Sequence, residues 1–82
     1  MSIEDLKKNR HEAALADFTR AIELDPNYAW ALYQRGQVLL ELGRYTEALA
    51  DFQRAAEIEP DNAGAQAELG ETLRLLRRYD EA

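Results

Sequence analysis

Apolar residues recur three or four positions apart along most of this chain, which is the spacing of one face of an α-helix. The clearest stripe consists of Tyr45, Ala48, Leu49, Phe52, Ala55 and Ala56. The positions between them are polar or charged: Glu47, Asp51, Arg54 and Glu57. We therefore expect one face of this helix to pack and the other to face water. A second stripe carries a glycine between two leucines, where a neighbouring helix must come close: Leu32, Gly36 and Leu39.

Prolines and a glycine divide this pattern into separate helices. Pro26 and Pro60 each follow an acidic residue and precede Asn or Asp, a context that ends a helix and favours a turn. Gly43 is suited to a left-handed helix terminus. Ser2 is a plausible N-cap for a short first helix. The predicted helices are 3–8, 11–24, 28–42, 45–59 and 63–76.

The sequence contains an internal repeat. Phe18 and Phe52 are 34 residues apart, as are Pro26 and Pro60. The same separation relates Gly36 to Gly70, Leu39 to Leu73, and Tyr45 to Tyr79. A period of this length is typical of stacked helical hairpins. We divide the single domain 1–82 into a partial repeat at 1–28, a complete repeat at 29–62 and a partial repeat at 63–82.

The complete repeat carries an ordered signature of apolar, small and aromatic residues that ends in proline: Leu32, Gly36, Leu39, Gly43, Tyr45, Ala48, Phe52, Ala55 and Pro60. In this signature the chain resembles the tetratricopeptide repeat family. The resemblance implies an all-α fold in which antiparallel helical hairpins stack as a right-handed superhelix. One departure is Arg35, which stands where the family usually has an apolar residue. It would either open a gap in the packing or extend its charged end to solvent.

Composition narrows the range of partners. The net charge is −6, with 16 acidic and 10 basic residues, so the surface repels phosphate and we expect no nucleic acid partner. The absence of cysteine excludes disulfides and thiolate metal sites. No run approaches the roughly 18 apolar residues that span a bilayer, and we expect no membrane partner. The first residues lack a signal-peptide pattern, so a cytoplasmic location is the default.

No arrangement of residues in the sequence predicts catalysis. His11 is the only histidine, and it occupies the place that Tyr45 has in the next repeat, so we expect it to pack there. Acidic pairs recur at the ends of equivalent helices, Glu23 with Asp25 and Glu57 with Glu59. These pairs are interpreted as solvated acids near turns, because no second catalytic partner repeats with them. We therefore expect no enzymatic activity, no cofactor and no metal.

The resemblance also implies that the first helix of each repeat lines a concave peptide-binding surface. At about 100° per residue, one face of helix 28–42 lies offset from the packing stripe. That face is aromatic, and Trp and Tyr are common at binding hot spots. With the corresponding face of the next repeat, the predicted peptide-binding residues are Trp30, Tyr33, Gln37, Leu40, Glu41, Glu71 and Arg74.

Two alternatives apply to this predicted site. Trp30 could instead pack on the preceding helix, against Ile22 or Leu24. Glu71 and Arg74 are three residues apart on a helix, a spacing that favours a simple ion pair in solvent.

One tetratricopeptide subclass grips the C-terminal carboxylates of chaperones with Lys, Asn and Arg side chains on this face. The corresponding positions here hold Tyr33, Gln34, Gln37, Gly64 and Glu68, so this clamp is absent. Glu41, Glu68 and Glu71 would also repel a terminal carboxylate. We therefore expect a neutral, apolar or mildly basic peptide as ligand.

Both ends of the array are expected to be open, because copies associate through them or because the chain is part of a longer array. Only the short helix 3–8 is predicted to cover the stripe Leu15, Phe18 and Ile22, and the final helix leaves Leu69, Leu73 and Leu76 uncovered. Arg77 replaces the glycine of the complete repeat, so the last helix either turns there or continues to Ala82. Two functions remain open: a protein–protein interaction module that binds a peptide, or a self-assembly unit that forms a homo-oligomer through open ends or swapped terminal helices.

Overall fold

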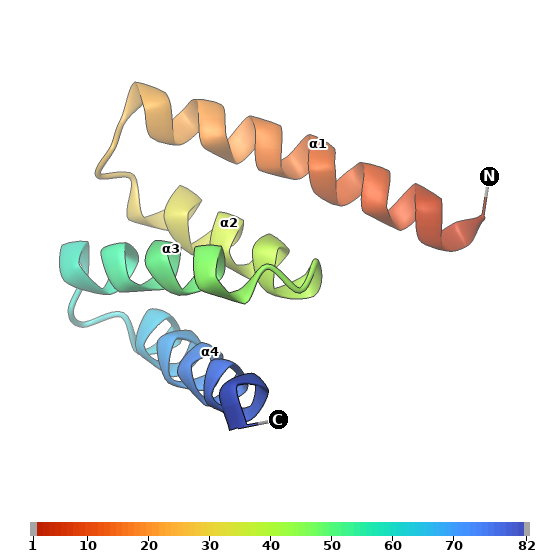
Figure 1. Ribbon diagram of the computed structural model, residues 1–82. Helices are drawn as coiled ribbons and strands as arrows, with labels where there is room; N and C mark the ends of the chain where they lie inside the picture. The colour runs from red at the N-terminus through yellow and green to blue at the C-terminus, as the bar shows by residue number, and fades with distance from the viewer. Residues whose placement is uncertain (1, 82) are drawn as a thin grey trace.

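The computed structural model describes residues 2–81, and the side chains of residues 2–78, as a stack of four α-helices (Figure 1). The helices are α1 (Ile3–Leu24), α2 (Ala29–Glu41), α3 (Tyr45–Ile58) and α4 (Ala63–Glu81). Each helix packs on the next one along the chain, and no strand occurs within the described residues. The predicted all-α fold of stacked helical hairpins is confirmed.

The turn between α2 and α3 is specified by a single glycine. Gly43 has a φ of 79°, a left-handed conformation that glycine adopts without a steric penalty. The Gly43 N–H donates to the Leu40 carbonyl at 3.0 Å, and the Arg44 N–H donates to the Leu39 carbonyl at 2.9 Å. These two bonds satisfy the last carbonyls of α2 in the Schellman pattern. The predicted glycine terminator is therefore confirmed.

The core of the molecule centres on Phe52, which is 0% exposed. A Cβ atom added to Gly36 would lie only 2.6 Å from the Phe52 ring, so the absence of a side chain at this position allows α2 to reach the ring. Ala48 and Ala55 flank Phe52 on α3 and are equally buried. The small residues therefore mark the close approach of two antiparallel helices, as the sequence predicts.

The first helix differs from the prediction. The sequence predicts separate helices at 3–8 and 11–24, but residues 3–24 form one uninterrupted helix. Neither proline nor glycine lies within this range, so nothing in the local chemistry ends a helix there. The predicted N-cap is confirmed, because the Ser2 side chain accepts a hydrogen bond from the Asp5 N–H at 3.1 Å.

Because α1 is uninterrupted, residues 3–8 cannot have the covering role that the sequence predicts for them. The sequence assigns residues 3–8 to cover the apolar stripe of 11–24, but as the start of α1 they cannot fold back on it. They extend past the ends of α2 and α3 in Figure 1, and residues 3–10 are all exposed. Leu15 is nevertheless buried, because it packs against Leu39 of α2.

The last helix follows the second of the two predicted alternatives. α4 runs through Arg77 without a turn and ends at Glu81; Ala82 lies outside the described residues. A left-handed arginine would cost roughly 1–2 kcal/mol, and a positive φ occurs only at Gly43 among the described residues. Because Arg77 replaces glycine, the helix continues.

Candidate functional site

The predicted residues of α2 lie together on one side of the helix. We call this set the inner face of α2: Trp30, Tyr33, Gln37, Leu40 and Glu41. Trp30 and Glu41 are exposed, and the other three are half-buried. Arg35 and Leu39 point to the opposite side at the helical angle of about 100° per residue. The inner face therefore forms a partly apolar surface of its own.

Trp30 is the most exposed aromatic residue of this face, at 54%. The Trp30 ring meets Phe18 of α1 edge-on, with ring centroids 5.6 Å apart and planes at 75°. A second ring, that of Tyr28, lies 5.7 Å away and is tilted by 33°. Trp30 thus packs on the preceding helix through Phe18, whereas the sequence alternative names Ile22 or Leu24. More than half of its surface still faces solvent.

Tyr33 links the inner face to the core. Its ring meets Phe52 at a centroid distance of 5.8 Å, with an interplanar angle of 61°. The Tyr33 hydroxyl accepts a hydrogen bond from the Gln37 side chain at 3.2 Å. The start of α4 lies beside this ring, because a Cβ atom on Gly64 would be 3.3 Å from the Tyr33 hydroxyl oxygen. Tyr33 therefore helps to pack α2 and α4 and presents only part of its surface.

Glu41 closes the inner face at the end of α2, where it forms an ion pair with His11 of α1. The Nε2 atom of His11 meets the Glu41 carboxylate, and Nδ1 lies 2.8 Å from the Lys7 carbonyl oxygen. The sequence predicts that His11 packs as Tyr45 does. In the structure His11 instead joins α1 to α2 through its contact with Glu41.

The two predicted residues of α4 form a pair of their own. Arg74 donates to both carboxylate oxygens of Glu71, at 2.5 and 2.7 Å. This hydrogen bonding raises the pKa of Arg74 above its usual value. The Arg74 side chain is exposed and that of Glu71 is half-buried. The ion pair that the sequence offers as an alternative is confirmed, and no described hydrogen bond joins it to the inner face of α2.

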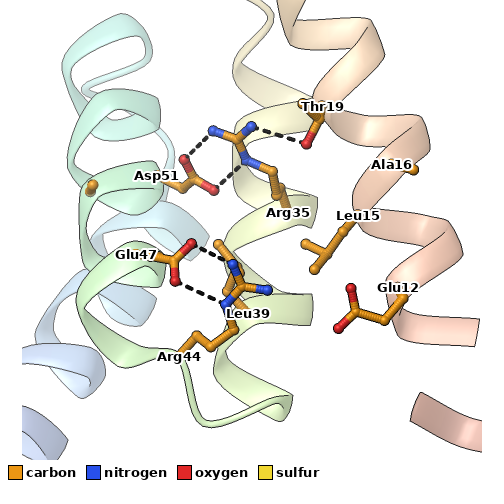
Figure 2. A pocket seen from close by; sticks show the side chains of 10 residues that line it. Glu12, Leu15, Ala16, Thr19, Arg35, Leu39, Arg44, Glu47 and Asp51 are labelled. Carbon is orange, nitrogen blue, oxygen red and sulfur yellow. Dashed lines mark hydrogen bonds and ion pairs between the residues drawn. The ribbon is translucent and has the colours of Figure 1, made fainter. Parts of the chain in front are cut away.

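A large open groove lies on the other side of α2, between α1 and α3 (Figure 2). We call it the α1–α3 groove; its volume is about 700 Å³. The sequence analysis does not predict it. Residues from three helices and the α2–α3 turn line it: Glu12, Leu15, Ala16, Thr19, Arg35, Leu39, Arg44, Glu47, Ala50 and Asp51.

An ion pair at one end of this groove corrects two predictions. Arg35 donates through Nε and Nη2 to the two carboxylate oxygens of Asp51, each at 2.7 Å, and through Nη1 to the Thr19 hydroxyl at 3.3 Å. Asp51 is therefore 5% exposed, whereas the sequence predicts that it faces water. Arg35 neither opens a gap nor extends to solvent, because the carboxylate satisfies its guanidinium in a bidentate pair. The pair holds α1, α2 and α3 together.

The signal for this pair is present in the sequence. Arg35 breaks the apolar pattern of α2, and a buried arginine requires an acidic partner. Asp51 is an acid on the helix that follows. Helical periodicity alone assigns Asp51 to the solvent-exposed face of α3, because it does not take account of a charge on the neighbouring helix.

Arg44 and Glu47 form a second ion pair in the groove. Arg44 donates to the Glu47 carboxylate at 2.9 and 2.7 Å. The hydrogen bond from Arg44 lowers the pKa of Glu47, and the same bond raises the pKa of Arg44. Glu12 lies near Arg44 across the groove (Figure 2). The two arginines that line the groove are thus each held by a carboxylate of α3.

Among residues 2–78, no group of three or more His, Cys, Asp or Glu side chains is placed to hold a metal ion. No described helix combines the length and apolar character that crossing a membrane requires.

Comparison with known proteins agrees with this geometry. A family model described as "Tetratricopeptide repeat" matches residues 29–62, and a second, described as "TPR repeat", matches residues 4–43. In all, 34 chains of solved structures match. One of them is the first TPR of Spaghetti (RPAP3) bound to the HSP90 peptide SRMEEVD, with a TM-score of 0.80 and 29% identity. The match covers 88% of this chain and 57% of that chain. No curated protein matches.

Proposed function

Because the chain belongs to the tetratricopeptide repeat family, whose members act as protein-interaction modules, we propose that it binds a peptide segment of a partner protein across the inner face of α2. The binding is non-catalytic. The similar RPAP3 structure holds a peptide, which supports this class of function.

The observation that carries this proposal is the state of Trp30. Its ring is held in place by Phe18 and Tyr28, yet it remains 54% exposed. An aromatic side chain that is already ordered loses little conformational entropy when a ligand covers it. Tryptophan is also among the residues most enriched at binding hot spots. Leu40 and Gln37 add an apolar contact and an amide on the same face.

The charge of the site favours a ligand without acidic groups. The peptide in the RPAP3 structure, SRMEEVD, is acidic near its C-terminus. In this chain Glu41, Glu68 and Glu71 lie on the helices that would meet a ligand, and of the three only Glu71 is paired with an arginine among the described residues. The positions that the chaperone clamp uses hold Gln34 and Gly64 instead of basic residues. The proposed ligand is therefore a neutral, apolar or mildly basic segment.

A peptide selection followed by calorimetry tests the proposal. Peptides selected on this chain from a random display library should combine apolar with Lys or Arg residues and should shift the fluorescence of Trp30, the chain's only tryptophan. SRMEEVD should bind much more weakly. Trp30→Ala should weaken the selected peptide at least about tenfold, the effect of removing a hot spot.

The matched control is Leu24→Ala, which removes a more exposed apolar side chain that lies outside the inner face. This variant should bind the selected peptide as the unchanged chain does. Equal affinity of Trp30→Ala and the unchanged chain, or selection of acidic C-terminal peptides, would contradict the proposal.

A further inference from the structure

The packing of α3 on α2 provides a template for a contact that α1 does not make. On α3, the small-aromatic-small stripe of Ala48, Phe52 and Ala55 is at most 1% exposed, because α2 covers it. The same stripe recurs 34 residues earlier on α1 as Ala14, Phe18 and Ala21. We call this set the α1 stripe. Its three residues are only half-buried, with Trp30 against the edge of Phe18.

The complementary surface recurs on α4. On α2, Gly36 leaves room for the Phe52 ring and Leu39 packs beside it at 4% exposure. The equivalents on α4 are Gly70 and Leu73, which we call the α4 notch. A Cβ atom on Gly70 would meet no atom of the described residues within 4 Å, and Leu73 is 43% exposed. The notch therefore carries the same residue types as the surface of α2 that receives Phe52, but no described side chain fills it.

From this complementarity we infer that a second copy of the chain is the partner of both surfaces. The α1 stripe of one copy docks into the α4 notch of another, with Phe18 against Gly70, and repeats between chains the contact that Phe52 and Gly36 make within one. Neither surface includes a residue of the inner face of α2, but Trp30 of that face contacts Phe18 of the α1 stripe, so the two sites are neighbours.

The positions of the two surfaces allow this contact to repeat from copy to copy without closing into a dimer. α1 and α4 lie at opposite edges of the stack, with α2 and α3 between them (Figure 1). The two surfaces differ, so the contact is head-to-tail and each added copy presents a new free surface. The expected product is a growing chain of copies and not a closed dimer.

The lengths of the two helices fit a contact between separate chains. Within the hairpin of α2 and α3, the helices must end at Gly43 to allow the turn. Between two copies no turn is needed, and both helices run past the equivalent position: α4 continues to Glu81, and α1 begins at Ile3, ahead of His11. Docked antiparallel, these extensions lengthen the contact. Exposed Ile3 and Leu6 lie on the extension of α1.

Two blocking variants test the inference by sedimentation equilibrium. Ala21→Arg places a long charged side chain on the α1 stripe, and Gly70→Arg fills the α4 notch, where a single chain has room for it. The average mass of the unchanged chain should rise with concentration beyond twice 9.4 kDa. Each variant alone should remain at 9.4 kDa. Ala50→Arg, on an exposed position of α3 within the α1–α3 groove, is the matched control and should associate as the unchanged chain does.

Mixing the two variants gives the decisive result. Gly70→Arg retains an intact α1 stripe and Ala21→Arg retains an intact α4 notch, so the equimolar mixture should form a complex of two chains and stop there. Circular dichroism checks that each variant is folded, and Ala14→Arg replaces Ala21→Arg if the latter is not. A constant mass of 9.4 kDa for the unchanged chain, a limit at the dimer, or a mixture that fails to pair would overturn the inference.

Discussion

At the scale of single residues, Gly36 and Gly70 occupy equivalent positions in two repeats but have opposite surroundings. Gly36→Ala should lower the free energy of unfolding by about 1–3 kcal/mol, because the new methyl group collides with the Phe52 ring. Gly70→Ala meets no neighbouring atom and should raise that free energy by up to about 1 kcal/mol through helix propensity. Urea denaturation followed by circular dichroism measures both. Equal stability of the two variants would contradict the close approach of α2 to Phe52.

Arg35 and Asp51 give a second prediction at this scale. Arg35→Leu restores the apolar residue usual in the family, but it leaves the Asp51 carboxylate buried without its partner. We expect this change to destabilise the fold by about 3 kcal/mol. The double variant Arg35→Leu/Asp51→Ala removes both charges and should recover most of the loss. Thermal unfolding of Arg35→Leu, Asp51→Ala and the double variant completes a double-mutant cycle. If the two single losses of stability simply add in the double variant, the pair is not coupled.

How well the sequence predicts single residues depends on where their partners lie. The burial of Phe52 and the need for glycine at position 36 follow from helical periodicity within one repeat. The pairing of Arg35 with Asp51, and of His11 with Glu41, joins side chains of different helices. Such pairs depend on how the helices are set against each other, which periodicity within each helix does not specify.

At the scale of elements, the beginning of α1 should be the least protected part of that helix. Residues 3–10 are all exposed, and the Ser2 side chain caps the first turn. Ser2→Ala should weaken the first turns by about 1 kcal/mol. Amide hydrogen exchange should then accelerate in residues 3–10 and remain unchanged in residues 14–22. An equal acceleration in both segments would mean that the extension contributes to global stability.

The boundaries of the elements show which sequence signals are reliable. The predicted limits of α2 and α3 differ from the observed ones by only a residue at an end, because Pro26, Gly43 and Pro60 stop helices by local chemistry. The prediction for α1 is wrong because it places a helix start at His11 by analogy with Tyr45. Repeat equivalence suggests a boundary there, but without proline or glycine the helix continues.

At the scale of the whole molecule, the 34-residue period predicts the stacked helical fold, and the helical angle predicts which residues share the inner face of α2. The α1–α3 groove was missed, because it arises between two helices that are not adjacent in the chain. The molecule thus separates two kinds of surface. The inner face of α2 is proposed to bind peptide, while the α1 stripe and the α4 notch are proposed to join copies.

The measurement that tests the peptide site most directly is an NMR titration of the Gly70→Arg variant with the peptide selected on the unchanged chain. This variant is expected to be monomeric, so shifts of its signals report on the peptide alone. The account predicts that the largest shifts occur at the Trp30 indole N–H, the Gln37 side-chain amide and the backbone of Leu40 and Glu41. Shifts centred instead on Thr19, Ala50 and Arg44 would place the ligand in the α1–α3 groove and contradict the proposed site.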